Sequence, residues 1–514
     1  MLASAQRGER RLCGVALAVL GLGCAPVEET PDDDVPALDA GAVDAGAVDA
    51  GAVDAGAVDA GVHDVGGAEG GARDAGTDAG GLDAGARDAG TDAGGTDTGT
   101  DAGTPDVGAD AGGTSGATGP VLYPGERVQS PMTASVAAGL RAVAGVRRRD
   151  DRVLAKVGAS NTVNSNFLHC FAGSNVDLGG REALRPTLDF NREGRIAGAS
   201  AFTRTSLAAT VGWSAWSSLQ GTPSPLQREV DAADPRVAVV MFGTNDIQSQ
   251  NWHRYGQNLW EIADVLRAQG VIAMFTAIPP RDDSPTADAW VPRYVAIMRA
   301  VAQGRQLPFV DLERVLRPLP GHGLGSDGIH MNTYSAGGAR GCVFSPAGLR
   351  YGFNQRNLLT LESLDRVRQA LAGRAPDPDL AALHLQGDGT SRTPFVIGGL
   401  PFSDLRDTRA AGEDRIDRYP GCNSAADESG PELHYTITVT ETTRVRAMVI
   451  VRGTTDIDLH LLRGPGFDGA ACVLRDDRIL TATLAPGTHR FVLDTYATQG
   501  AARAGEYLFV LVRE

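Results

Sequence analysis

Three short segments of the sequence carry side chains that could together activate a hydroxyl group. Ser160 follows an apolar run at residues 152–157. Asn245 stands in a Gly-Thr-Asn-Asp segment, and His330 comes three residues after Asp327. A serine hydroxyl is a poor nucleophile until a base removes its proton, and a histidine oriented by a carboxylate is such a base. These residue types therefore indicate nucleophilic catalysis by serine.

Strands and helices alternate around these segments, between residues 120 and 375. Apolar runs of strand length are followed by helical patterns, which predicts a parallel sheet with helices on both faces. In such a sheet, reactive groups gather at the carboxyl ends of the strands, and each of the three segments follows a predicted strand. The predicted strands are 153–157, 237–242, 271–278 and 307–312, and the predicted helices are 131–146, 257–270 and 290–302.

Each segment also has a purely structural interpretation. The stretch at 158–162 is also compatible with an ordinary turn of small residues, the Gly-Thr-Asn-Asp segment with a plain turn, and the loop that contains His330 with a surface loop. His169 and His322 are rivals for the base, although neither has an Asp three residues before it. The order of the segments along the chain has to separate these alternatives.

In this order the segments resemble the SGNH (GDSL-type) hydrolase family over residues 150–372. The family has four signature residues, Ser, Gly, Asn and His, and an Asp three residues before the His. Carried over, they are Ser160, Gly212, Asn245, His330 and Asp327. The resemblance implies a flavodoxin-like, three-layer α/β/α domain with a parallel sheet.

The resemblance also implies a mechanism. His330 would take the proton of Ser160 during attack on an ester carbonyl, and Asp327 would orient the imidazole. The backbone N–H groups of Ser160 and Gly212 and the side-chain amide of Asn245 would bind the oxyanion. This chemistry needs no metal and no organic cofactor.

The first block departs from the family pattern. Where the family usually has Gly-Asp-Ser, this chain has Ala159 before the serine. We expect altered hydrogen bonding in the loop, because the missing carboxylate is not the acid of the triad. An inactive, degenerate member of the family is the alternative.

The substrate is less specified than the reaction. Trp213 and Trp216 flank the oxyanion glycine, where exposed indoles could stack on sugar rings; packing in the core is the alternative. No long apolar lid is present in the sequence, which favours small acyl esters, including those of acylated carbohydrate. An O-acyltransferase with the same triad and a non-catalytic, glycan-binding adhesin remain open.

The first 24 residues have the layout of an export signal. A basic start precedes the apolar core at 13–23, which is too short to span a bilayer and ends at Cys24. This pattern resembles a bacterial lipoprotein signal, which implies lipidation of Cys24 and a membrane anchor. An ordinary secretory leader is the alternative, and with either the protein leaves the cytoplasm.

Residues 25–119 are predicted to be a disordered tether. A pentapeptide, Asp-Ala-Gly-Ala-Val, repeats from Asp39, and 21 acidic residues face two Arg between Ala25 and Pro120. Few large side chains can be buried here, and the spaced charges repel one another. A calcium-binding repeat is the alternative. The rest of the chain is close to neutral, which argues against nucleic acid as a partner.

Residues 376–514 alternate in the manner of an all-β sandwich. The segments 455–461, 484–488 and 505–507 resemble the bacterial pre-peptidase C-terminal domain, which implies an accessory module. Asp456 and Asp458 are expected on a solvated face of a strand, with a calcium site as the alternative.

Four cysteines fall two by two in the folded regions. Because the chain is exported, we expect the disulfides Cys170–Cys342 and Cys422–Cys472, each within one domain. Buried free thiols are the alternative. The first bond would fasten the edge of the proposed site.

Overall fold

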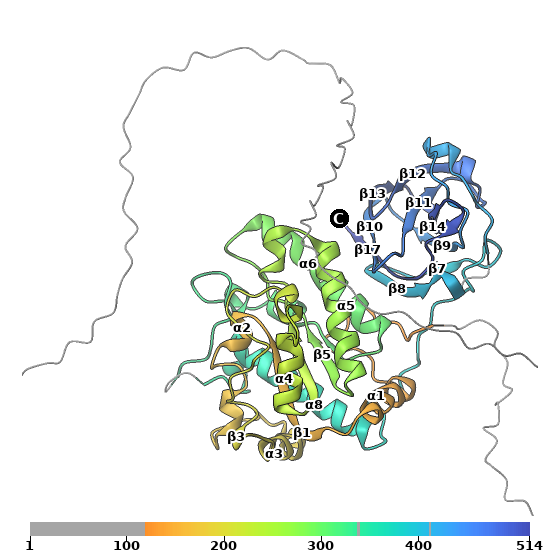
Figure 1. Cartoon of the computed structure of the whole chain (residues 1–514). Helices are drawn as coiled ribbons and strands as arrows, with labels where there is room; N and C mark the ends of the chain where they lie inside the picture. The colour runs from red at the N-terminus through yellow and green to blue at the C-terminus, as the bar shows by residue number, and fades with distance from the viewer. Residues whose placement is uncertain (1–118, 337–339, 411–412) are drawn as a thin grey trace, which may run out of the picture. The chain divides into compact units, whose positions relative to one another are not determined.

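A computed structural model describes residues 119–336, 340–410 and 413–514. The predicted leader and tether lie outside these residues, as does Cys24. No helix among the described residues is long and apolar enough to cross a membrane. Figure 1 shows the arrangement of the elements.

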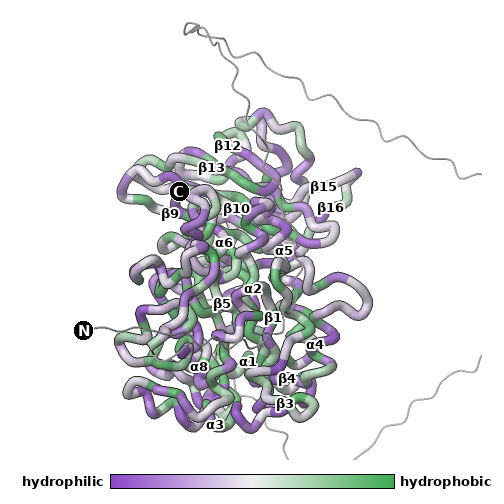
Figure 2. Tube along the Cα trace, turned by 90° about the vertical axis from the view of Figure 1, so that its left-hand side faces the viewer, coloured by the Kyte–Doolittle hydropathy of each residue, from purple (hydrophilic) through white to green (hydrophobic). Residues whose placement is uncertain are grey.

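The first part is an α/β domain built on a parallel sheet, as predicted. The sheet order is β1-β4-β5-β6 and all neighbouring strands are parallel. Every residue of β4 and β5 is buried, so both faces of the sheet are covered, and these hydrophobic strands run through the interior (Figure 2). The strands are β1 (Asp150–Gly158), β4 (Pro235–Met241), β5 (Ile272–Thr276) and β6 (Phe309–Val310).

Helices flank this sheet in pairs. Helix α1 packs against α8, and α5 lies beside α6 (Figure 1). Polar caps fix where several of them start: the side chains of Thr133, Ser224 and Ser284 accept hydrogen bonds from the first turns of α1, α4 and α6. The helices are α1 (Ala134–Val146), α2 (Ser160–Val163), α3 (Arg185–Arg192), α4 (Pro225–Ala233), α5 (Trp252–Ala268), α6 (Pro285–Gly304), α7 (Leu312–Leu316) and α8 (Gly352–Leu371).

The last part of the chain is a β-sandwich of two sheets, also as predicted. The strand orders are β13-β10-β17-β8 and β12-β11-β14-β9-β7, antiparallel except for the pair β7 and β9. Buried residues of both sheets form one core cluster. The resemblance to the pre-peptidase domain stays a prediction. The strands are β7 (Phe395–Ile397), β8 (Phe402–Asp407), β9 (Leu433–Val439), β10 (Thr443–Val451), β11 (Ile457–Leu462), β12 (Cys472–Asp476), β13 (Ile479–Leu484), β14 (Gly487–Thr495) and β17 (Glu506–Arg513).

Strands β10 and β17 of the sandwich are buried on both faces. One face contributes to the sandwich core, while Met448, Ile450, Leu508 and Val510 belong to the same hydrophobic cluster as the α/β domain. In this cluster β10 packs against α5, and β17 packs against α6. The two folded parts therefore share a continuous apolar core.

Both predicted disulfides are present. Cys170 and Cys342 are joined across 172 residues, and Cys422 and Cys472 across 50 residues. The expectation that Asp458 lies on a solvated face is wrong, because its exposed fraction is 2%. A loop covers that face of the strand.

Candidate active site

Ser160 is separated from the end of β1 by Ala159 alone and is the first residue of the short helix α2. Gly158, at the end of the strand, leaves no room for a side chain, because a Cβ would lie 2.4 Å from Thr162 Oγ1 and 2.6 Å from the carbonyl oxygen of Met241. The glycine thus lets the chain turn tightly against β4. This turn brings Ser160 to the carboxyl edge of the sheet, where its side chain is half-buried.

The loop that carries His330 places its ring on the serine. His330 Nε2 lies 2.8 Å from Ser160 Oγ, and His330 Nδ1 lies 2.6 Å from Asp327 Oδ2. The other carboxylate oxygen of Asp327 accepts the backbone N–H groups of Ile329 and His330, each at 3.0 Å. Gly328 has φ +66° and packs against the backbone of Asp283 at a distance that excludes a Cβ, so the tight loop requires glycine there.

The carboxylate of Asp327 is held in its ionised form. Partial burial would raise its pKa, but the hydrogen bonds from the His330 ring and from the two backbone N–H groups outweigh burial and lower the pKa to about 2. At neutral pH an ionised Asp327 therefore accepts the Nδ1 proton of the ring. Nε2 is then free to accept the proton of Ser160.

Two side chains that the sequence analysis did not single out hold the serine turn, Asn161 against the histidine loop and Arg356 against α8. Asn161 Oδ1 accepts the backbone N–H of Met331 at 3.1 Å. The buried guanidinium of Arg356, on α8, donates to the carbonyl oxygen of Asn161 at 2.7 Å and to Thr162 Oγ1 at 3.0 Å. Burial lowers the pKa of Arg356 to about 9. Asn161 therefore links the serine turn to the histidine loop, while Arg356 fixes the serine turn itself.

Gly212 lies in a loop that runs along the edge of β1. The carbonyl oxygen of Ala208 accepts the N–H of Gly158 at 3.1 Å, and the N–H of Thr210 donates to the carbonyl of Gly158 at 3.2 Å. This pairing extends the sheet by one short segment beyond β1. Gly212 follows it with φ +81° and is exposed.

Asn245 reaches the Gly212 loop from the end of β4. Its Nδ2 donates to the carbonyl oxygen of Trp213 at 2.8 Å, which leaves the second amide proton for another acceptor. Asp246 joins the same two loops, because its carboxylate accepts the N–H of Ala215 and the N–H of Gly243, each at 3.0 Å. Burial raises the pKa of Asp246 to about 6, although these hydrogen bonds oppose the shift.

Of the two rivals for the base, His322 has an acidic partner of its own. Its Nδ1 lies 2.7 Å from Asp282 Oδ1, a residue 40 positions away in sequence. The backbone N–H of Asp282 donates to the carbonyl of Gly328, so this pair adjoins the histidine loop. Burial lowers the pKa of His169, the other rival. Of the three histidines His169, His322 and His330, the one that hydrogen-bonds to Ser160 is His330.

The surroundings of the serine are open and partly apolar. The side chains of His330 and Asp327 are 39% and 50% exposed. Trp216 and Val211, on either side of Gly212, are 45% and 66% exposed, whereas Trp213 packs against the core. Packing in the core therefore describes Trp213, Trp216 is exposed, and stacking on sugar rings stays a prediction.

One protein family matches part of the α/β domain, over a range that begins after Ser160. Residues 189–334 match the GDSL-like lipase/acylhydrolase family; the match includes Gly212, Asn245, Asp327 and His330. No significant match was found among curated proteins.

Solved structures with a similar chain trace include two hydrolases. An acetylxylan esterase from Geobacillus stearothermophilus is 13% identical, with a TM-score of 0.27, over 41% of this chain and 93% of the esterase. A GDSL-like lipase from Bacteroides thetaiotaomicron is 14% identical, with a TM-score of 0.27, over 45% of this chain and 98% of the lipase.

Proposed function

We propose that the protein is a serine esterase that works through an acyl-enzyme. The observation that carries the proposal is the hydrogen-bonded chain from Ser160 through His330 to Asp327, with distances of 2.8 and 2.6 Å. A nucleophile, a base and an orienting acid in this order are what acyl transfer by serine requires. The GDSL-like match over residues 189–334 supports the same reaction class.

In the first half of the reaction, Ser160 Oγ bonds to the acyl carbon while His330 Nε2 takes the hydroxyl proton. Asp327 stabilises the imidazolium that forms. The oxyanion is bound by the N–H of Ser160, the N–H of Gly212 and the free amide proton of Asn245. His330 then protonates the leaving alcohol as its C–O bond breaks.

In the second half, water replaces the alcohol. His330 removes a proton from the water as its oxygen attacks the acyl carbon of the acyl-enzyme. The bond to Ser160 Oγ breaks, the serine regains its proton from His330, and a carboxylic acid leaves.

A fluorophosphonate probe tests this assignment directly. The native protein should be labelled covalently, and Ser160→Ala should abolish labelling. Ser217→Ala removes a half-buried hydroxyl from the loop beside Trp216 and should leave labelling intact. A native protein that is folded but resists the probe would instead favour a non-catalytic, glycan-binding protein.

For the substrate, we propose small acyl esters of carbohydrate. The open triad and the exposed indole of Trp216 support this choice, because a polymer can reach the serine and a sugar ring can stack on the indole. Trp216→Ala should raise KM for acetylated xylan oligomers while leaving turnover of p-nitrophenyl acetate unchanged. Equal effects on both substrates would contradict a sugar-stacking role.

We further propose that the enzyme is exported and anchored by a lipid on Cys24. The proposal rests on the leader-like sequence at residues 1–24. Fractionation of cells that produce the full chain should find the native protein with membranes, and Cys24→Ala should release it. Recovery of the native protein in the cytoplasm would contradict export.

A further inference from the structure

Three buried, ionisable side chains converge in the β-sandwich, away from the serine. Asp458 and His460 stand two positions apart on β11, so both point to the same face of the strand. The alternate residues of β11 point into the sandwich core, and the segment 413–431 covers the face that carries Asp458 and His460. Glu428 comes from this covering segment. The exposed fractions of Glu428, Asp458 and His460 are 0%, 2% and 0%.

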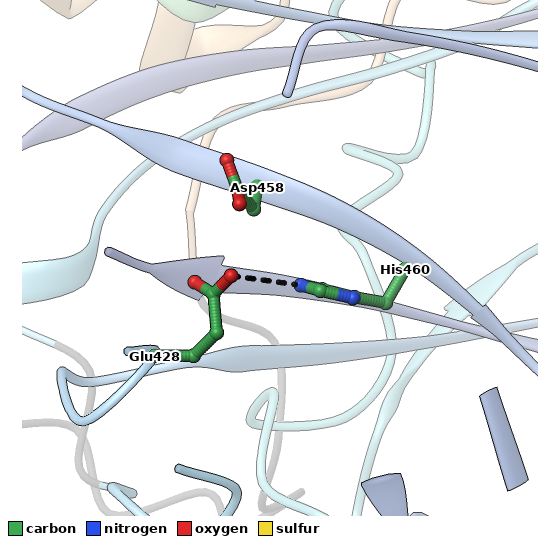
Figure 3. A group of neighbouring side chains, drawn as sticks. All are labelled: Glu428, Asp458 and His460. Carbon is green, nitrogen blue, oxygen red and sulfur yellow. Dashed lines mark ion pairs between the residues drawn. The ribbon is translucent and has the colours of Figure 1, made fainter. Parts of the chain in front are cut away.

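The polar atoms at the centre of this group meet one another and little else. Among the described residues, no backbone, hydroxyl or amide group donates to the Glu428 carboxyl, whose neighbours are the Asp458 carboxyl, the His460 ring and Arg475, and Nε2 of His460 has no hydrogen-bond partner. Glu428 and His460 point toward each other, with Oε1 and Nε2 3.8 Å apart (Figure 3). Two carboxyls and an imidazole buried against one another are costly unless a proton or a cation joins them, which makes the group a candidate set of metal ligands.

The available ligand atoms are close enough to share one ion. One such atom from each of the three residues lies within 4.8 Å of the others. Ligands about 2.0–2.1 Å from a tetrahedral zinc ion lie about 3.4 Å from one another, so small side-chain shifts would close the site.

Arg475 supplies part of the missing charge from the edge of the group. Its guanidinium bonds to Asp458 and lies 3.6 Å from Glu428 Oε1. It also lies 3.2 Å from Asp477, an exposed carboxylate, which gives it an outward partner. Arg475 neutralises one of the two buried carboxylates and leaves the other with no full countercharge. A cation at the centre would supply the missing positive charge, and Arg475 would retain its ion pair with Asp477.

The ring of His460 is already held for ligation. It stacks on Tyr419 with a centroid distance of 3.5 Å and an angle of 9°. Nδ1 faces the sulfur of Cys472 at 4.0 Å, while Nε2 faces the carboxylates. Nδ1 can therefore carry the proton, which leaves the Nε2 lone pair for a metal.

We propose that Glu428, Asp458 and His460 bind a divalent cation of the zinc class. One imidazole and two carboxylates suit zinc and its first-row neighbours, whereas calcium takes six to eight oxygen ligands. A water molecule would complete the tetrahedron. The site takes no part in ester cleavage, so the expectation that the reaction needs no metal is unaffected.

A second buried histidine in the same module shows that residue types alone do not make this site. His434 has Glu413 3.7 Å from Nδ1 and Glu432 3.7 Å from Nε2, on different ring nitrogens. Both carboxylates also have other partners, since Glu413 accepts the Ser391 hydroxyl and Glu432 accepts the N–H of Arg415. His434 is therefore a matched control.

The bound ion would fasten the covering segment to the sheet. Glu428 belongs to that segment, while Asp458 and His460 belong to β11. The disulfide from Cys422 to Cys472 already joins the same segment to β12. Metal and disulfide would thus hold one loop at two points.

The test uses the full chain with intact disulfides, stripped with EDTA and titrated with Zn²⁺ by calorimetry. We expect a site that raises Tm when filled and gives visible absorption bands with Co²⁺. Glu428→Gln and Asp458→Asn should each weaken Zn²⁺ binding at least tenfold, while His434→Gln leaves it unchanged. Every variant keeps His330 and His322. Any Zn²⁺ bound by those residues therefore contributes equally to each titration.

Two results would overturn the proposal. One is a native protein that binds neither Zn²⁺ nor Co²⁺ and whose Tm does not respond to them, a result that depends on no variant. The other is unchanged binding in folded Glu428→Gln and Asp458→Asn. Either result would indicate that a proton shared between Glu428 and Asp458, and not a metal ion, holds the three side chains together.

Discussion

Replacing Asp327 with asparagine keeps the shape of the side chain but removes the acceptor that faces the His330 ring. In the native site, Oδ1 accepts two backbone N–H groups and Oδ2 accepts the ring proton. The amide oxygen of asparagine should remain on the two backbone donors, because turning it away would set the amide N–H₂ against them. The amide N–H₂ then faces Nδ1. The ring must therefore take the tautomer in which Nδ1 accepts a hydrogen bond and Nε2 carries the proton.

The size of the effect follows from this tautomer. With Nδ1 accepting, Nε2 carries the proton and cannot take one from Ser160. The loss expected for such a wrong tautomer is about 10³–10⁴-fold in kcat/KM, or about 4–5.5 kcal/mol of transition-state stabilisation. The loop should stay folded, because its backbone hydrogen bonds keep their acceptor.

The measurement is the hydrolysis of p-nitrophenyl acetate by native protein and by two matched variants. Asp282→Asn makes the same change in the pair with His322, whose separation of 2.7 Å is nearly the same. This control lies beside the histidine loop but outside the chain from Ser160 to Asp327, and its backbone bond to Gly328 is kept, so kcat/KM should stay within about twofold. Equal losses in both variants, or more than a tenth of native activity in Asp327→Asn, would refute the assignment.

Further changes probe the rest of the site. Asn245→Ala should lower kcat about 10²–10³-fold with little change in KM, measured by steady-state kinetics, because it removes one oxyanion donor. Asp246→Asn should lower both kcat and Tm, because an amide cannot accept from both of the loops that the carboxylate joins. Breaking the bond between Cys170 and Cys342, by replacing both with Ala, should cost about 5 kcal/mol in the free energy of unfolding, measured with denaturant, for a loop of 172 residues. Finally, the pKa of Asp327 is lowered to about 2 from an ordinary value of 3.8, so its ionised form stabilises the fold above pH ~4 and that contribution is lost as the pH falls through 2. The difference in unfolding free energy between native protein and Asp327→Asn should therefore be constant near neutral pH and shrink in acid.

The sequence was enough to predict the α/β domain and the β-sandwich. Strands buried on both faces have to be continuously apolar, and β4 and β5 show this pattern directly. The ends of such strands meet at one edge, so Ser160 and Asn245 could be placed there from the order of the segments. The contact between Asp327 and His330 was predicted through the resemblance to the SGNH family, in which an Asp stands three residues before the His.

Contacts between distant segments could be predicted only where a family motif or the pairing of cysteines marked them, as for Ser160 with His330 and Cys170 with Cys342. The partner of His322 lies 40 residues away, and Arg356 reaches Asn161 across 195 residues. These two contacts carry no such mark in a single sequence, because they depend on how loops and helices pack in three dimensions. Helix α6 begins at Pro285, before the apolar pattern that predicts it, since Ser284 caps it. Asp458 was misplaced because alternation reveals which residues share a face and not what covers that face.

The apolar contacts of β10 and β17 with α5 and α6 also determine how the molecule can be divided. A fragment cut at residue 375 would retain α5 and α6 but lose the strands that shield them from water. Such a fragment is expected to self-associate, since a large uncovered apolar surface promotes aggregation. The smallest tractable unit for crystallisation or enzymology is therefore the stretch from 119 to 514, with both folded parts retained.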